Sequence, residues 1–183
     1  DVDWIRASGA GGRDQDASEV MAIRSLFGDE IPLVTSTEAN FGHCNGAGPA
    51  IGVVSAFEVQ RKGWIPPTLH YTDTTFPGID FVPNHSRKQK ATYFLSSTAA
   101  FGGTNVVLAG CPRLREEEAE SDTYQQDWDE VVISGMGLVS GFGCAGNQFV
   151  DRIPMDSSMI GPIIRSGFPL NSGMQAGMVR NFS

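Results

Sequence analysis

Residues 36–48 are STEANFGHCNGAG, a segment in which three glycines surround His43. The residues directly before it, 31–36, are mostly β-branched and aliphatic between turn formers, and they predict a strand. The residues directly after it, 49–62, place apolar side chains in a broad stripe and end in basic residues before Gly63, which predicts a largely buried helix. Loops held between regular elements often carry binding or catalytic residues, so His43 is the first candidate site residue.

A second strand, loop and helix precede this segment. Residues 1–7 predict a short buried strand, which leads into SGAGG at 8–12, a loop without bulky side chains. Asp16 as the N-cap, with Glu19 as its capping-box partner, predicts a helix over 17–27 that stops at the following glycine.

Further strand signals follow the helix at 49–62. A proline pair forces extended backbone within residues 65–70. Residues 91–97 and 104–109 then predict two strands that flank Phe-Gly-Gly at 101–103, the third glycine-rich loop of the chain.

An acidic segment divides the chain. Residues 114–130 contain eight acidic side chains and almost nothing to bury, which is typical of an exposed linker. A new strand signal, Val-Val-Ile, begins at 131. We therefore predict a first unit over 1–114, a linker over 115–129 and a second unit over 130–183.

Composition excludes several classes of protein. The 183 residues include 13 basic and 21 acidic side chains, and the net charge of −8 repels nucleic acids and anionic membrane surfaces. No apolar run approaches the roughly 20 residues of a membrane span. The three cysteines form no CxxC pair, so neither a disulfide framework nor a metal site is expected, and a reducing cytoplasm fits best. The chain starts at Asp1 without a signal-peptide pattern, which indicates a cut inside a longer chain.

Five segments in sequence order resemble the β-ketoacyl synthase family, and more narrowly its C-terminal half. They are SGAGG at 8–12, STEANFGHCNGAG at 36–48, IPPT at 65–68, DFVPN at 80–84 and AFGGTN at 100–105. The segment EVVISGMGLVSGFG at 130–143 instead resembles the N-terminal start of a family member. The C-terminal half comes first, so tandem synthase subunits, a circular permutation and a rejoined reading frame all stay open as origins.

The resemblance implies a partial thiolase-like α/β fold with α-β-α-β-α layers. It also implies a chemistry in which a cysteine holds an acyl thioester, malonyl-acyl carrier protein loses carbon dioxide, and the enolate attacks the acyl carbon. The phosphopantetheine of the carrier protein is then the substrate arm, and the chain itself needs no cofactor. The nucleophilic cysteine belongs to a family segment that is absent here, and we predict that Cys44, Cys111 and Cys144 are small buried thiols.

The resemblance also assigns site residues. His43 matches the second of the family's two catalytic histidines, which donate hydrogen bonds to the enolate oxygen. A nearby helix N-terminus favours a neutral ring at this position. Phe101 matches the residue whose amide completes the thioester oxyanion hole and whose ring gates the nucleophile. The predicted substrate-binding residues are Gly102, Gly103, Thr104 and Asn105.

Two positions depart from the family pattern. Ser8 stands at the place of the first catalytic histidine, and its hydroxyl is too short to reach where an imidazole nitrogen would. Glu38 stands at the place of the family's lysine and inverts its charge. Both departures remove groups that the decarboxylation needs.

Three hypotheses about function remain. The favoured one is a chain-length-factor-like partner that shapes the acyl tunnel of an active ketosynthase in a heterodimer of a fatty acid or type II polyketide synthase. The alternative is a catalytic β-ketoacyl synthase, an acyltransferase whose cysteine another chain supplies. The third, an inert structural remnant or interaction module, requires Phe101 and His43 to be exposed or mispacked.

Overall fold

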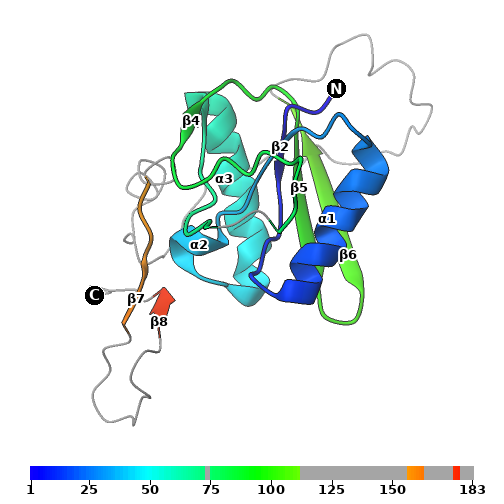
Figure 1. The fold of residues 1–183 in the computed structure, drawn as a ribbon. Coiled ribbons are helices and arrows are strands. Elements are labelled where there is room, and N and C mark those ends of the chain that lie inside the picture. Colours follow the sequence, from blue (N-terminus) through cyan, green and yellow to red (C-terminus); the bar gives the residue numbers. More distant parts are fainter. Residues whose placement is uncertain (73–74, 112–155, 163–174, 178–183) are drawn as a thin grey trace, which may run out of the picture.

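The computed structural model describes residues 1–72, 75–111, 156–162 and 175–177 (Figure 1). Its main sheet has four strands in the order β2-β1-β5-β6. These strands are β1 (Trp4–Arg6), β2 (Leu33–Thr35), β5 (Phe94–Ala100) and β6 (Thr104–Gly110). The strands predicted over 1–7, 31–36, 91–97 and 104–109 are therefore confirmed, and the last two form one hairpin.

Three strands of this sheet, β2, β1 and β5, run parallel. Ile5 of β1 lies opposite Val34 of β2 on one side and opposite Leu95 of β5 on the other. The hairpin partner β6 is antiparallel to β5. It lies at the sheet edge, and its residues from Thr104 to Ala109 are exposed.

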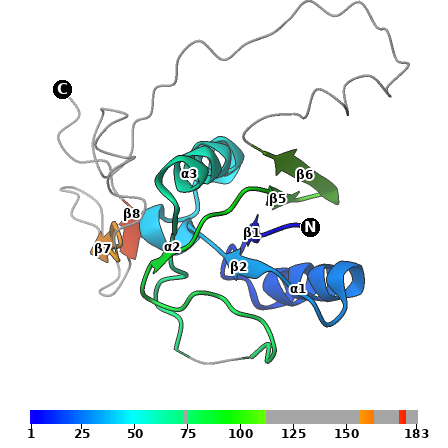
Figure 2. The same cartoon turned by 90° about the horizontal axis from the view of Figure 1, so that it is seen from above.

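Two helices cover opposite faces of the sheet, α1 (Arg13–Phe27) and α3 (Gly48–Lys62) (Figure 2). Because successive strand residues point to opposite faces, Trp4 packs in a cluster with Ala56 and Val59 of α3, and Ile5 packs in a cluster with Ile23 of α1. The same alternation directs Arg6 toward α3, which places a charged side chain in an apolar layer.

The start of α1 differs from the prediction. The helix begins at Arg13 and not at 17, and its N-cap is Gly12, so the predicted capping box of Asp16 and Glu19 is wrong. The Glu19 carboxylate instead accepts hydrogen bonds from the backbone N–H groups of Ser8 and Gly9, at 2.8 and 2.9 Å. The amides of the loop that leads into the helix need hydrogen-bond acceptors, and the carboxylate of Glu19, in the second turn of the helix, provides them.

The other helix is confirmed, and the glycine-rich loop before it contains short helical turns. These are α2 (Glu38–Phe41) and the 3-10 helix η1 (Asn45–Ala47). Gly63 ends α3 in the left-handed conformation, with φ of 68°. The small strands β3 (Trp64–Ile65) and β4 (Arg87–Lys88) pair antiparallel beyond it.

The predicted linker 115–129 lies outside the described residues, and so does most of the predicted unit 130–183. The structure describes two of its strands, β7 (Ile160–Pro162) and β8 (Gln175–Gly177), which pair antiparallel. Across the described residues, no helix is both long and apolar enough for a transmembrane segment.

Candidate functional site

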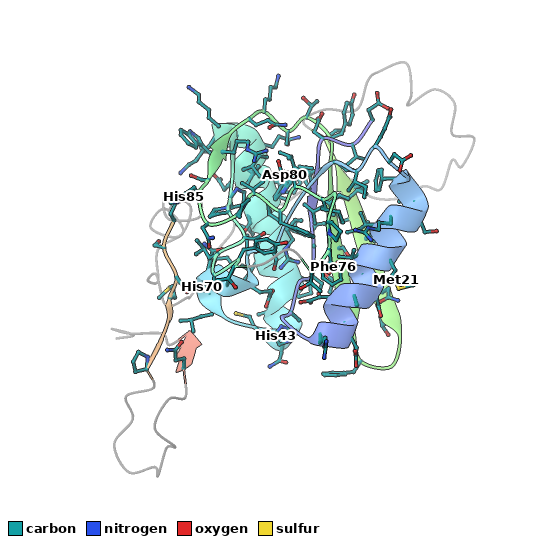
Figure 3. All side chains as sticks on the ribbon, viewed as in Figure 1. Met21, His43, His70, Phe76, Asp80 and His85 are labelled. Atoms are coloured by element: carbon teal, nitrogen blue, oxygen red, sulfur yellow. The ribbon has the colours of Figure 1, made fainter. Side chains whose placement is uncertain are left out.

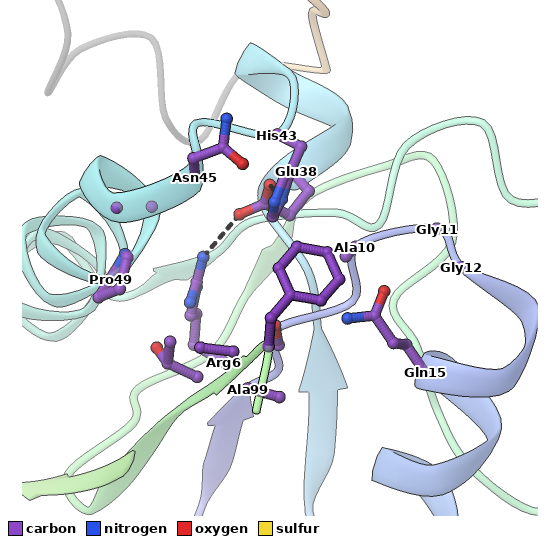
Figure 4. A pocket seen from close by; sticks show the side chains of 16 residues that line it. Arg6, Ala10, Gly11, Gly12, Gln15, Glu38, His43, Asn45, Pro49 and Ala99 are labelled. Atoms are coloured by element: carbon purple, nitrogen blue, oxygen red, sulfur yellow. Dashed lines mark hydrogen bonds and ion pairs between the residues drawn. The ribbon is translucent and has the colours of Figure 1, made fainter. Parts of the chain in front are cut away.

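A pocket of about 520 Å³ opens where the chain leaves three strands of the main sheet (Figure 4). Ser8 follows β1, Glu38 follows β2, and Phe101 follows β5. Because the carboxyl ends of parallel strands meet at one edge of a sheet, these residues converge there. The pocket lining contains all three together with His43, so the structure brings together the four residues predicted to be catalytic or at catalytic positions.

The centre of the site is the Glu38 carboxylate, which contacts a side chain on each of its two oxygens. Nη2 of Arg6 lies 3.1 Å from Oε1 of Glu38, and Nδ1 of His43 lies 3.0 Å from Oε2 of the same carboxylate. Arg6 and Glu38 are 2% and 9% exposed, whereas the His43 side chain is half exposed to the pocket. The Glu38 carboxylate therefore joins a buried cation to an accessible imidazole.

Arg6 is a site residue that the sequence analysis missed. Its Nη1 also donates to the carbonyl of Ser97 at 3.2 Å, while its Nε has no hydrogen-bond partner among the described residues. Burial lowers the pKa of Arg6, and the Glu38 carboxylate opposes that shift, so the guanidinium stays charged at neutral pH. An arginine at the end of an otherwise apolar strand indicates a buried charge that needs a partner. The partner, Glu38, is 32 residues away in the sequence, so the strand itself does not identify it.

Gly52 makes room for this arginine. A Cβ at position 52 of α3 would lie 2.6 Å from Cζ of Arg6 and 2.7 Å from its Nε and Nη1. Real Cβ atoms do not approach other heavy atoms so closely. The glycine is therefore needed for the guanidinium to lie between β1 and α3.

The Glu38 contact sets which His43 nitrogen carries the proton. An ionised carboxylate can only accept hydrogen bonds, so Nδ1 of His43 must donate to Oε2 of Glu38. In the neutral ring the other nitrogen, Nε2, then holds a lone pair. A neutral His43 consequently offers the pocket an acceptor.

The hairpin loop lies partly outside the pocket. Phe101 contributes to the lining but is 91% exposed. Gly102 and Gly103 form the turn with φ of 83° and 82°, a backbone conformation that residues other than glycine rarely adopt. These glycines and the next two predicted substrate-binding residues, Thr104 and Asn105, are exposed and do not line the pocket.

Cys44, the cysteine next to His43, does not have the features of an activated thiol. Cys44 and Cys111 are half-buried and not buried as predicted, and Cys144 lies outside the described residues. Burial and the nearby Glu38 carboxylate raise the pKa of Cys44, which disfavours the nucleophilic thiolate. Its Sγ donates to the carbonyl of Gly42 at 3.3 Å. Within the described part of the chain no group of histidine, cysteine and acidic residues is placed to hold a metal.

Known proteins match the part of the chain that carries this site. Residues 1–72 match the family of the beta-ketoacyl synthase C-terminal domain. Nodulation protein E of Rhizobium meliloti is 35% identical over 112 residues, which is 60% of this chain and 28% of that protein. The 3-oxoacyl-[acyl-carrier-protein] synthase 2 of Coxiella burnetii is 36% identical over 110 residues, which is 58% of this chain and 27% of that protein.

A solved structure agrees with the sequence matches. The ishigamide ketosynthase/chain length factor superposes with a TM-score of 0.57 at 32% identity, covering 59% of this chain and 27% of that one. These matches confirm the predicted resemblance to a C-terminal half and the predicted fold class. The chain spans little more than a quarter of the length of these relatives. The predicted second unit at 130–183 stays a prediction.

Proposed function

Because the matched part of this chain is the C-terminal portion of a β-ketoacyl synthase family member with a thiolase-like α/β fold, we propose that the chain acts as a chain-length-factor-like partner. In this role it helps to shape the acyl tunnel of an active ketosynthase in a heterodimer and performs no condensation itself. The substrates of that heterodimer are acyl groups carried on the phosphopantetheine of an acyl carrier protein. The names of the matched synthase and of the matched ketosynthase/chain length factor support this assignment.

The contact between Glu38 and His43 carries the proposal. An enolate oxygen forms as malonyl thioester loses carbon dioxide, and it must be met by preorganised hydrogen-bond donors. The Glu38 carboxylate accepts a hydrogen bond from Nδ1–H of His43, so a neutral ring carries its lone pair, and no N–H, on Nε2. A lone pair repels the developing oxyanion.

A second hydrogen-bond donor is missing from the same pocket, because Ser8 stands at the place of the family's first catalytic histidine. Its backbone N–H donates to Glu19, and the site has no other imidazole in its lining. Removal of a single oxyanion-hole donor costs enzymes about 10²–10³ in rate. With both donors lost, a site of this kind retains very little decarboxylase activity.

The catalytic alternative rests on a different observation. His43 is half exposed and Phe101 is 91% exposed, so both are accessible to a cysteine supplied by another chain. A protonated His43 has N–H groups on both ring nitrogens and could then donate to the pocket and to Glu38 at once. The two hypotheses therefore differ in whether His43 is essential.

The third hypothesis, an inert structural remnant or interaction module, also requires Phe101 and His43 to be exposed. The buried ion pair argues against that hypothesis. A buried charge is costly unless it is paired, and here Arg6, Glu38 and the space beside Gly52 match one another. A site without a role has no need of such an arrangement.

Reconstitution with the ketosynthase subunit tests the proposal. We expect His43→Ala in this chain to lower condensation by less than about tenfold, whereas replacement of the cysteine nucleophile in the ketosynthase abolishes it. Size-exclusion chromatography of each variant controls for loss of the dimer. Complete loss of malonyl decarboxylation in His43→Ala, with the dimer intact, would assign the catalysis to this chain.

A further inference from the structure

A short segment from the predicted second unit packs on the elements beside the candidate site. Residues 156–160 run past α2, and β7 lies next to that helix in both views of the ribbon (Figures 1 and 2). We call residues 156–159 the strap. Its hydrogen bonds reach two places: the C-terminal part of α2 and the loop that contains His85 (Figure 3).

The first group of contacts closes the open end of α2. A helix leaves its last carbonyl groups without partners, and in a helix of four residues these make up most of its backbone acceptors. The strap satisfies two of them: the Ser158 hydroxyl donates to the carbonyl of Ala39 at 2.6 Å, and the N–H of Met159 donates to the carbonyl of Asn40 at 2.6 Å. The strap thus takes the place of a helix cap.

The Asn40 side chain reinforces this junction. Its amide Nδ2 donates to the carbonyl of Ser157 at 3.3 Å, and the residue is 1% exposed. A buried amide is costly unless it is hydrogen-bonded. The strap supplies the hydrogen-bond partner of that Nδ2.

The second group of contacts fixes the start of the strap. One oxygen of Asp156 accepts from the backbone N–H of Ser86 at 2.7 Å, and the other lies 2.9 Å from Nδ1 of His85. Burial raises the pKa of Asp156, but the hydrogen bonds from His85 and Ser86 outweigh this and leave it below its ordinary value. Asp156 is therefore charged at neutral pH and pairs with both donors.

From these contacts we propose that α2 and the His85 loop form a docking surface for the strap, which attaches the second unit of the same chain to the first. The attachment has a consequence for the site, because α2 begins with Glu38. A helix of four residues is not stable by itself, so its position depends on what packs against it. The strap is thus a positioning element for the carboxylate that holds Arg6 and His43.

Hydrogen–deuterium exchange on the full chain, purified in the assembly that it forms, tests the docking. In Asp156→Ala we expect amide exchange to rise at least about tenfold in the peptide that contains Ser86 and in the strap itself. Ser158→Ala should do the same for the strap and for peptides from α2. Asp29→Ala, a loop substitution away from the strap, is the matched control. Peptides from β1 and β5 report whether the sheet is intact in each variant.

Unchanged exchange in both strap variants, with the sheet peptides protected, would overturn the proposal. A cysteine pair tests whether the contact forms within one chain. After oxidation, His85→Cys with Asp156→Cys should give a disulfide within a monomer, identified by peptide mass mapping, whereas Lys88→Cys with Asp156→Cys should give far less. A disulfide found only between two copies would contradict docking within the chain. Neither experiment depends on condensation activity, so its outcome is separate from that of the partner-subunit proposal.

Discussion

At the scale of single residues, the two oxygens of Glu38 hold the candidate site together. Oε1 pairs with Arg6 and Oε2 with His43, so a carboxylate that is nearly buried has a partner on each side. Taking two charges out of water is expensive, and removing one member of a buried pair leaves the other uncompensated. A substitution of Glu38 by a residue without a negative charge therefore leaves the buried Arg6 guanidinium without its ion-pair partner.

Substitutions at position 38 test this coupling. Glu38→Lys places a second cation beside the buried Arg6, and we expect it to destabilise the fold by about 3–5 kcal/mol. In combination with Arg6→Met, the same Glu38→Lys change should cost much less, because the repulsion is gone. Thermal or denaturant unfolding of the subunit in its complex gives the double-mutant cycle, and strictly additive effects would count against the pair.

Gly52 gives an independent test of where the guanidinium lies. Gly52→Ala inserts a methyl group against the Arg6 side chain, and we expect a loss of about 1–3 kcal/mol of stability from overpacking. Gly46→Ala is the matched control, because nothing lies within 4 Å of a Cβ at that position. Equal melting temperatures for the two variants would mean that Arg6 lies elsewhere.

At the scale of elements, local patterns predict the parts of the fold whose partners are near in sequence. The apolar stripe of 49–62 and the hairpin around residues 101–103 are predicted correctly, because periodicity and turn residues specify them. The start of α1 is not, because Glu19 bonds loop amides and not the helix terminus. The pairing of Arg6 with Glu38 depends on two strands meeting in the sheet, which no local pattern records.

The acidic segment is an element that only the sequence describes. Its eight acidic side chains and few apolar ones cannot offset the entropy lost on ordering, so we predict that 115–130 is exposed and open to proteases. Limited digestion with an acid-specific protease, followed by mass mapping, should cut first within this range. First cuts inside α1, with the acidic segment intact, would rule out the linker assignment.

At the scale of the whole molecule, one edge of the sheet is left uncovered by the described residues. Val106 and Val107 of β6 are both 59% exposed, and Phe101 at the hairpin turn is 91% exposed. An exposed apolar strand at a sheet edge tends to pair with other chains. In the proposed function the complementary part of the synthase assembly covers this edge and completes the pocket.

Isolation of the chain tests this interpretation of the open edge. We expect residues 1–183 produced alone to aggregate or to unfold without a cooperative transition, because β6 and the hairpin turn stay exposed. Co-production with the ketosynthase subunit should give a soluble complex with a cooperative melt. Analytical ultracentrifugation and calorimetry distinguish the two states, and a cooperative monomer from the isolated chain would contradict the expectation.

The tautomer of the His43 ring decides between a non-catalytic partner and a catalytic subunit. In the assembled protein with ¹⁵N-labelled histidine, the ring nitrogen shifts at neutral pH report which nitrogen carries the proton. In the neutral ring we expect a proton on Nδ1 and none on Nε2, and we expect Glu38→Gln to relax that preference, because its amide can also donate to the ring. A neutral His43 protonated on Nε2 in the unsubstituted protein would restore a donor to the pocket and contradict the assignment of a non-catalytic partner.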